Sequence, residues 1–299
     1  MPSLTREQFL KLIEAHPDAD LGSRDLSGID LSLTNLQEVD LTGANLTGAN
    51  LRGAFADRAT LTRAYMRGAN LTHLHFSQNA NLQNADLGGA NLSGVLLENA
   101  NLQNADLGGA NLSGTTLSGA NLAYANLRGA NLRRADLTYT RLGDANLQEA
   151  DLSEANLCWA SLNDADFRRA SLANAKMKNA NLCGAYLGEA NLLDTDLSGS
   201  YLRYANLRGA IASNADLHDA FLDGADLQNT HLVNSNLQNA HLYGANLQNA
   251  NLKRANLRGA KLFLTQLVGA DLTDATMPNG EKYDLAKHDK DYRKDYRNK

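Results

Sequence analysis

Residues 80–94 read A-N-L-Q-N, A-D-L-G-G, A-N-L-S-G, and the same letters recur at residues 100–114. The apolar residue at the centre of this five-residue unit returns at every fifth position through two blocks, 21–76 and 82–277, which hold 12 + 40 = 52 units. Of these centres 45 are Leu, and the residue two positions before each centre is usually Ala. The repeat therefore occupies most of the 299 residues and decides the fold.

A period of five fits neither regular element of secondary structure. On an α-helix every fifth residue advances by about 500°, so the Leu side chains would spiral around all faces. On a flat strand a spacing of five alternates between the two faces. The pattern therefore predicts a chain that turns a corner in every repeat. The centre and the small residue two before it then point inward, and the other three residues face water.

The residue two positions after the centre carries the signal for that corner. It is very often Gly, as at Gly43 and Gly89, or Asn or Asp, as at Asn84 and Asp144. This is the third residue of a four-residue turn that begins at the centre. A type II turn requires positive φ there, which Gly adopts freely and Asn tolerates.

The identical stretches 80–94 and 100–114 are separated by a shift of 20 residues, which indicates four corners in each coil. Fifty-two repeats then make about 13 coils. With roughly 4.8 Å between stacked coils, the solenoid would be on the order of 60 Å long. Such a solenoid grows by adding coils, so the length of the chain does not indicate several globular domains.

These repeats resemble the pentapeptide-repeat family, whose motif is A(D/N)LXX, over residues 17–278. The resemblance implies an all-β fold, a right-handed quadrilateral β-helix. It also implies a bacterial protein, because family members abound in bacteria. It leaves the function open, because most members have no assigned activity.

A short helix is predicted at the N-terminus, over residues 1–16. Thr5 followed by Gln8 matches a capping box, and Leu4 and Phe9 match the hydrophobic staple that accompanies it. A solenoid exposes its core at both ends unless it is capped. We therefore expect this helix to cover the first coil, with a partner-binding helix as the alternative.

Two departures from the period are also informative. Six residues separate Phe76 from Leu82, which predicts one inserted residue near 77–79 and a local bulge. After the repeats of residues 17–278, the tail 279–299 is rich in Lys, Asp and Tyr and lacks the apolar stripe of a dimerising helix. We expect an extension without regular structure, with Tyr283 and Leu285 folded onto the last coil.

Composition narrows the class of protein. The net charge is −5 with acids and bases interspersed, which argues against a nucleic-acid partner and a membrane surface. No run of 18 apolar residues exists, and the N-terminus lacks an apolar signal segment. With only Cys158 and Cys183, free thiols and a cytoplasmic location are expected.

The sequence offers no candidate for catalysis, for a cofactor or for a small-molecule substrate. His73 and His75 form an H-x-H pair, but nothing nearby in the repeat supplies further Cys or His ligands, so no metal is expected. The many Asp residues, such as Asp86 and Asp106, would lie on a flat, solvated wall. General acid–base chemistry needs a cleft that such a wall does not provide.

Two sets of large side chains interrupt the uniform surface. The first is a group of outward residues on one face that we predict to contact a partner: Tyr201, Tyr204, Phe221, Tyr243, Phe263 and Leu264. The alternative is that these side chains merely stack along a ladder. The second is a basic group that nearby acids turn into a charge-mixed wall: Arg128, Arg133, Arg134, Arg168 and Arg169.

Two functions follow from this reading. The first is a non-enzymatic interaction scaffold or regulator with flat faces for protein partners, present as a monomer or weak dimer. The second is a DNA-mimicking, topoisomerase-binding protein that confers inhibitor resistance, as the resemblance allows. Duplex DNA of 60 Å presents roughly 35 charges. The repeats carry 33 − 7 = 26 acids and 28 − 9 = 19 bases, a net of −7, which favours the first function.

Overall fold

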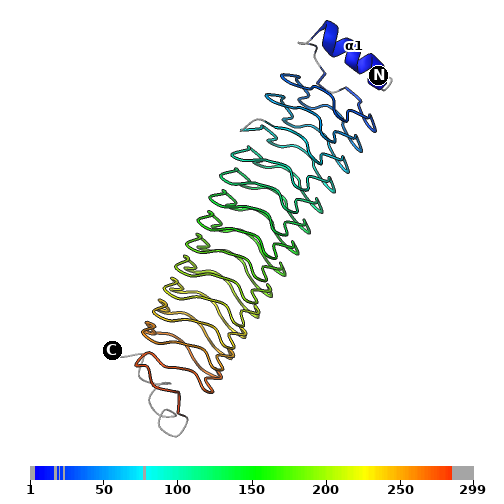
Figure 1. Ribbon diagram of the computed structural model, residues 1–299. Coiled ribbons are helices and arrows are strands. Elements are labelled where there is room, and N and C mark those ends of the chain that lie inside the picture. Colours follow the sequence, from blue (N-terminus) through cyan, green and yellow to red (C-terminus); the bar gives the residue numbers. More distant parts are fainter. Residues whose placement is uncertain (1–3, 17–18, 20, 23, 77–78, 285–299) are drawn as a thin grey trace. The chain divides into compact units, whose positions relative to one another are not determined.

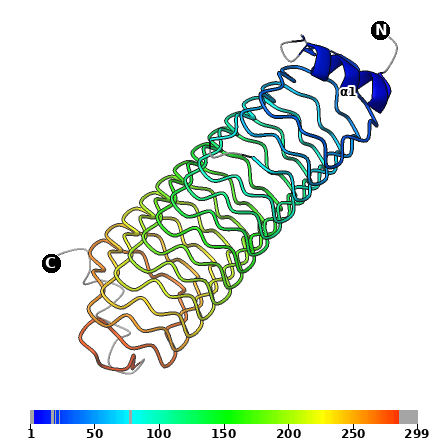
Figure 2. The same ribbon diagram turned by 45° about the horizontal axis from the view of Figure 1, so that its top comes forward.

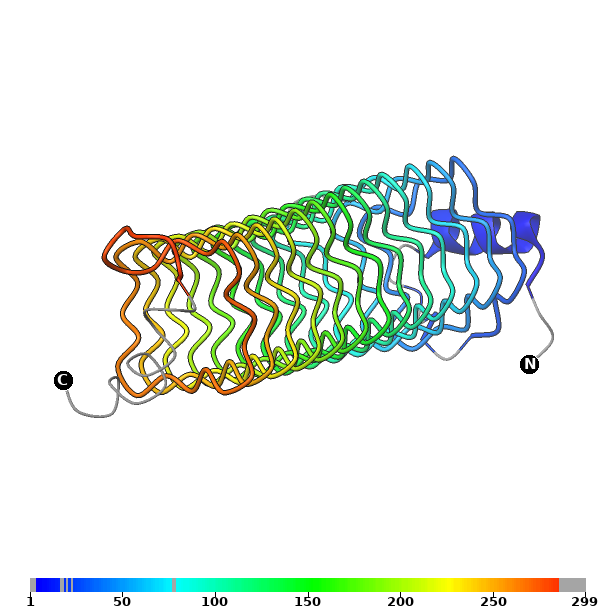
Figure 3. The same cartoon turned by 90° about the horizontal axis from the view of Figure 1, so that it is seen from below.

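The chain divides into two compact units, Met1–Asp151 (unit 1) and Leu152–Lys299 (unit 2), which are described one at a time. In each unit the backbone forms stacked coils that turn a corner in every repeat (Figure 1). The corners of successive coils lie in rows along each unit (Figure 3). The computed structural model describes residues 4–16, 19, 21–22, 24–76 and 79–284.

Within each unit, parallel backbone pairing joins each coil to the next, as single bridges rather than long strands. Residues 20 positions apart are paired, for example Asn91 with Asn111 and Asn181 with Tyr201. Three of the five N–H groups in each repeat bond to neighbouring coils. Among the five residues 91–95 these are Asn91 to the carbonyl of Ala69 (2.9 Å), Leu92 to Asn111 (2.8 Å) and Gly94 to Ser113 (3.0 Å).

The remaining two N–H groups of the repeat close the corner. The N–H of Val95 donates to the carbonyl of Leu92 (3.1 Å), which completes the four-residue turn that begins at the centre. The N–H of Ser93 donates to the side-chain Oδ1 of Asn91 (3.1 Å). The Asn or Asp before the centre therefore supplies the acceptor that the turning backbone lacks.

The predicted positive φ at the third turn residue is confirmed. Gly43, Gly89, Asn84 and Asp144 have φ values of 70°, 64°, 57° and 57°. The same conformation also holds side chains that adopt it at a cost of about 1–2 kcal/mol each. Among these are Leu33, Tyr124, Tyr139, Trp159, Tyr204 and Leu264.

Side-chain amides form a second ladder on the surface of each unit. In unit 1 the Nδ2 of Asn70 donates to Oδ1 of Asn50 (3.3 Å), whose own Nδ2 donates to Asp30 (3.0 Å). In unit 2 Asn256 donates to Asn236 (3.1 Å), which donates to Asp216 (3.0 Å). Every bond points toward the N-terminus, and both ladders start at a carboxylate, which only accepts.

The core is a column of Leu centres lined by small residues. The described centres are buried except Phe76, which is half-buried, and most of the Ala residues two positions earlier are buried too. Where Thr or Ser replaces Ala, its hydroxyl is buried and donates to a backbone carbonyl. Thr195 bonds to Leu172 (2.8 Å) and Ser200 to Leu197 (2.6 Å). The core therefore accepts a hydroxyl at this position when it is hydrogen-bonded, and it also accepts the larger Ile29, Val39 and Val95.

The inserted residue predicted near 77–79 appears as a change of register. Phe55 pairs with His75 at a spacing of 20, but Thr60 pairs with Asn81 and Tyr65 with Asp86 at a spacing of 21. Residues 77 and 78 lie outside the described residues. One coil of unit 1 thus contains the extra residue, and the ladder resumes its spacing of 20 afterwards.

The helix α1 spans Arg6–Ala15 and lies over the first coils of unit 1 (Figure 2). Its N-cap is Thr5, and the predicted capping box with Gln8 is confirmed. Phe9 is fully buried, as expected of a cap. Arg6 donates to the backbone carbonyls of Asp30 (2.7 Å) and Ser32 (3.0 Å), which ties the helix to the coil beneath it.

The last coil of unit 2 is covered by the residues that directly follow it. Lys282 pairs antiparallel with Thr276, and the N–H of Tyr283 donates to the carbonyl of Ala275 (2.8 Å). Tyr283 therefore folds back onto the last coil, as predicted, whereas Leu285 lies outside the described residues. The total of 13 coils and the division at residues 16 and 278 stay predictions.

Replacing Phe9 by Ala is expected to detach α1 from unit 1, because emptying this buried site costs about 3–5 kcal/mol. Hydrogen exchange measures the result. The amides of Leu26 and Leu31, which bond to the next coil at 2.7 Å, are expected to exchange at least about tenfold faster. Phe9→Leu is the control. Unchanged exchange at both amides in Phe9→Ala would contradict a capping role.

Acidification is expected to weaken the corner at Asp40. Hydrogen bonds from the Thr42 and Thr60 hydroxyls and the Thr42 N–H lower the pKa of Asp40 below 3.8. The stabilisation is present above that value and is lost as pH falls through the lower folded pKa. Asp40→Asn keeps an acceptor without the charge. The melting temperature of the parent is expected to fall toward that of Asp40→Asn below about pH 3.8; a constant difference down to about pH 2 would refute this.

Candidate functional site

The six residues predicted to contact a partner lie around one row of centres in unit 2, and we call them the aromatic face: Tyr201, Tyr204, Phe221, Tyr243, Phe263 and Leu264. They occupy three adjacent rows, at one position before and at one and two positions after the centre. Parallel bridges join successive members of the first row: Tyr201, Phe221, His241 and Lys261. The fold therefore brings together side chains that are far apart in sequence.

The rings of the aromatic face stack on one another along these rows. Tyr201 and Phe221 are nearly parallel at 5°, with ring centroids 5.1 Å apart. Tyr243 stacks on Phe263 at 5.4 Å. The His241 ring meets Phe221 edge-on at 4.7 Å. The faces of these rings are turned toward their neighbours, so the wall presents mainly ring edges and phenol groups.

Tyr204 extends the face at the corner. A Cβ added to Gly224 would lie 2.7 Å from two ring carbons of Tyr204, so the ring rests directly on this glycine. Tyr204 is nevertheless 76% exposed, the largest exposure among these six residues. Tyr201, Tyr243 and Leu264 are also exposed, while Phe221 and Phe263 are half-buried.

The aromatic face interrupts the hydrogen bonding of the corners. Elsewhere in the same row Asn181 accepts the N–H of Cys183 (3.2 Å). At the next four coils no side chain of that kind precedes the centre. Among the described residues no acceptor is found for four successive N–H groups, those of Arg203, Asp223, Tyr243 and Phe263. Each lost bond forgoes about 1 kcal/mol of stability.

Charged groups border the rings. Arg203 pairs with Asp223 (3.2 Å) and lies over the Phe221 ring, 5.7 Å from its centroid. The Nζ of Lys261 lies 3.0 Å from Nε2 of His241. Lys261 adds an exposed positive charge at the end of the row.

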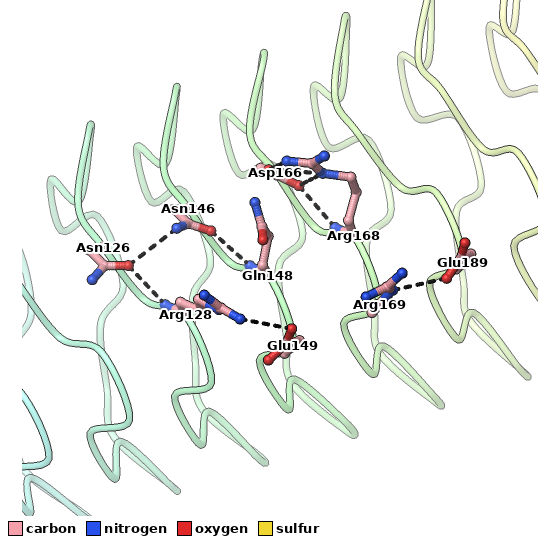
Figure 4. A network of polar contacts seen from close by, with 9 residues as sticks. All are labelled: Asn126, Arg128, Asn146, Gln148, Glu149, Asp166, Arg168, Arg169 and Glu189. Carbon is pink, nitrogen blue, oxygen red and sulfur yellow. Dashed lines mark hydrogen bonds and ion pairs between the residues drawn. The ribbon is translucent and has the colours of Figure 1, made fainter.

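The predicted charge-mixed wall is present in each unit (Figure 4). In unit 1 Arg128 pairs with Glu149 (3.1 Å). In unit 2 Arg169 pairs with Glu189 (2.9 Å), and Arg168 binds Asp166 through two nitrogens. The hydrogen bond to Asp166 raises the pKa of Arg168. These arginines are engaged by acids and do not form an anion site.

Sequence reasoning missed the role of Arg67. Its guanidinium binds Asp86 (2.8 Å) and Asp106 (2.9 Å), on two successive coils, and crosses Gly88 between them. These pairs raise the pKa of Arg67. In the sequence, the only sign of this contact is Gly88, at the position that the Arg67 side chain crosses.

A second apolar group, in unit 1, was also missed. Phe55 stacks on His75 with centroids 4.9 Å apart, and Leu96 is exposed in the same row of repeats. Together with Thr116 these residues again replace Asn or Asp before four successive centres. Aligning the repeats at spacings of 20 and 21 residues would have placed these four residues in one row.

Other chemistry is sparse in the described part of the chain. There, no three His, Cys, Asp or Glu side chains are grouped to hold a metal ion. Cys158 and Cys183 are free, and burial raises the pKa of the Cys158 thiol. None of the described helical structure is long and apolar enough to cross a bilayer.

The contact between Tyr204 and Gly224 can be tested with a matched pair of substitutions. Both Gly224 and Gly244 have positive φ, but a Cβ at Gly244 would meet nothing within 4 Å. Each change to Ala is expected to cost about 1 kcal/mol for the backbone conformation. Gly224→Ala is expected to cost at least about 1 kcal/mol more, because it displaces the ring. Equal melting temperatures would contradict this packing.

Comparisons with known proteins point to one family. Eight segments between residues 18 and 279 match the family model described as Pentapeptide repeats. No curated protein matches the chain. Neither the family model nor the structures that follow indicate a catalytic family.

Two solved structures are similar to the chain. One is HetL, a pentapeptide repeat protein involved in heterocyst differentiation regulation from the cyanobacterium Nostoc, 31% identical over 94% of this chain and 100% of HetL, with a TM-score of 0.26. The other is trypsin-treated QnrB1, a plasmid-mediated fluoroquinolone resistance protein, 24% identical over 64% of this chain and 86% of that chain, with a TM-score of 0.41. The chain belongs to the pentapeptide-repeat family, and its fold is a right-handed quadrilateral β-helix.

Proposed function

We propose that this chain is a non-enzymatic scaffold or regulator that binds a protein partner through the aromatic face. The observation that carries the proposal is the run of four coils in which the acceptor of the corner is replaced by large side chains. Those coils give up hydrogen bonds and place apolar surface in water. A local rule broken in this way, without a gain in stability, is typical of a functional surface.

The geometry of the rings favours a protein over a sugar or a nucleic acid. Sugars and bases stack on open ring faces, whereas Tyr201 and Phe221 cover each other's faces at 5.1 Å. Ring edges and phenol groups suit the mixed contacts of a protein interface, in which Tyr and Phe are enriched. Arg203, held over Phe221, adds a side chain of the type common at interface hot spots.

A regulatory role fits the chemistry of the walls. The Asp residues before the centres accept hydrogen bonds from N–H groups of the corners, as Asp86 does from Gly88 N–H at 3.1 Å. Their carboxylates are therefore already engaged by the backbone. HetL, 31% identical over most of the chain, is involved in regulation. The free thiols Cys158 and Cys183 support a reducing, cytoplasmic setting for this role.

The DNA-mimicking alternative has less support. A mimic needs a continuous surface of unpaired negative charge. Here Arg67 bridges Asp86 and Asp106 and offsets one of their two charges, and Arg208 pairs with Asp226 (3.4 Å). Inhibition of gyrase supercoiling, or protection from a gyrase inhibitor, at sub-micromolar protein would reverse this ranking.

The proposal is tested by removing the two half-buried rings together, with Phe221→Ala plus Phe263→Ala. Loss of one interface anchor typically costs about 2 kcal/mol, so capture of partners from a lysate of the native organism is expected to fall at least about 30-fold. Circular dichroism checks that the coils remain folded.

The matched control is Tyr65→Ala plus Tyr186→Ala, which removes two exposed rings outside the aromatic face. This variant is expected to retain the partners that the parent captures. The proposal fails if the aromatic-face variant captures the same proteins in the same amounts as the parent and the control.

A further inference from the structure

We infer that the chain associates with a second copy of itself, head to tail: the aromatic face and its basic border on one copy contact an apolar groove beside α1, and the acidic coils around that groove, on the next. The inference rests on the proposed function only in using the same face as a contact surface. It adds a second surface, in unit 1, that the proposed function does not involve.

The basic side of the contact is a segment of unit 2 without acids. Residues 227–270 contain no Asp or Glu but four bases, Lys253, Arg254, Arg258 and Lys261, a net of +4. Lys253 pairs with Asp271 (3.2 Å). Arg254, Arg258 and Lys261 are exposed and form no ion pair with a described residue. Arg258 and Lys261 lie within six residues of Phe263 and Leu264 and border them, whereas Arg254, ten residues before Leu264, lies two corners away in the same coil.

The opposite charge is concentrated in the first coils of unit 1. Residues 18–62 contain seven acids and three bases, a net of −4. Hydrogen bonds from Ser27, Ser32 and Thr42 lower the pKa of Asp25, Asp30 and Asp40. The two segments are therefore equal and opposite in formal charge.

An apolar groove lies beside these acids, between α1 and the coil at residues 33–39. Its volume is about 720 Å³, and its apolar lining is formed by Leu10, Ile13, Leu33 and Val39. Arg6, Glu14 and Glu38 also line it, and Glu38 pairs with Arg58 (3.1 Å). A groove of this size holds one or two aromatic side chains.

Leu33 is the residue in this groove that folding alone does not explain. Its side chain is 75% exposed, and its backbone has φ of 57°, a conformation that favours Gly or Asn. Leu is thus placed in water on a strained corner. Tyr204, equally exposed at 76% and also with positive φ (58°), is its counterpart on the aromatic face. Burial of each against the other copy would remove this exposure of apolar surface to water.

A second copy fits these features better than a nucleic acid or an anionic membrane. The ring faces are closed to bases, as the stacking of Tyr201 and Phe221 shows. The half-buried Phe221 and Phe263 do not project far enough to enter a bilayer. Because the two surfaces differ, the contact is heterologous, and each copy offers one of each surface. Such contacts either close into a ring or extend as an open chain of copies.

The experiment is sedimentation velocity on the full chain over a range of concentrations. At about 0.05 M salt the weight-average mass is expected to rise at least about twofold by about 100 μM protein. At about 0.5 M salt the increase is expected to disappear, since the charges are then screened. A monomer at every concentration and salt would overturn the inference.

Two charge-reversal variants separate the surfaces. The first carries Glu14→Lys plus Glu38→Lys on the groove, and the second carries Arg258→Glu plus Lys261→Glu on the basic border. Each alone is expected to stay monomeric, because both of its surfaces then have the same sign. An equimolar mixture is expected to regain association, since each groove meets a border of opposite charge. A chain with all four changes is expected to associate as the parent does.

Matched controls keep the net charge of each variant but change other surfaces. They are Glu98→Lys plus Asp194→Lys for the first variant, and Lys176→Glu plus Lys178→Glu for the second. Both controls are expected to associate like the parent. The head-to-tail contact is overturned if the groove variant or the border variant still associates as the parent does.

The outcome is independent of the proposed function. If the chain is monomeric throughout but Phe221→Ala plus Phe263→Ala still loses a cellular partner, the inference fails and the scaffold stands. If the charge-swapped mixture associates and no partner is captured, the reverse holds. If both are observed, self-association and partner binding are expected to compete, because they use the same rings.

Discussion

Every peptide N–H in the five-residue repeat needs an acceptor while the backbone turns a corner, and the rest of the structure depends on meeting this requirement. Three N–H groups bond to neighbouring coils, one closes the turn, and the last is accepted by the Asn or Asp before the centre, as Asn91 does for Ser93. Positive φ at the third turn residue, near 60° in Gly and non-Gly residues alike, makes this pattern possible. The inward Leu and Ala follow, because only a narrow column of space is left.

The same requirement shows where the surface is free to differ. The position before the centre either completes the corner or presents a side chain for another purpose, and it cannot do both when that side chain is aromatic. In unit 2 four successive coils, from Tyr201 to Lys261, present a large side chain at this position in place of the acceptor. A shorter contact of the same type joins Phe55 and His75 in unit 1. Deviations of this kind are where partners are best sought in a fold whose walls are otherwise uniform.

Much of the fold is predictable because it follows from a period. The spacing of five gave the corners, the shift of 20 gave the stacking, and the motif at Thr5 and Gln8 gave the helix cap. The outward positions of the aromatic face follow from the same count. The stacking of its rings and the reach of Arg67 to Asp106, 39 residues away, do not, because they depend on side-chain rotamers that no period specifies. The groove beside α1 depends on how a non-repeating helix packs, which lies outside the repeat altogether.

The side-chain amide ladders have a direction, and this has a consequence for biosynthesis. In Asn70, Asn50 and Asp30 each amide donates to the residue one coil nearer the N-terminus, and the ladder starts at a carboxylate. A coil that leaves the ribosome therefore meets acceptors that are already in place on the coil made before it. The order of Asp and Asn in these ladders therefore suits winding from the N-terminus, which is also the order in which the chain is synthesised.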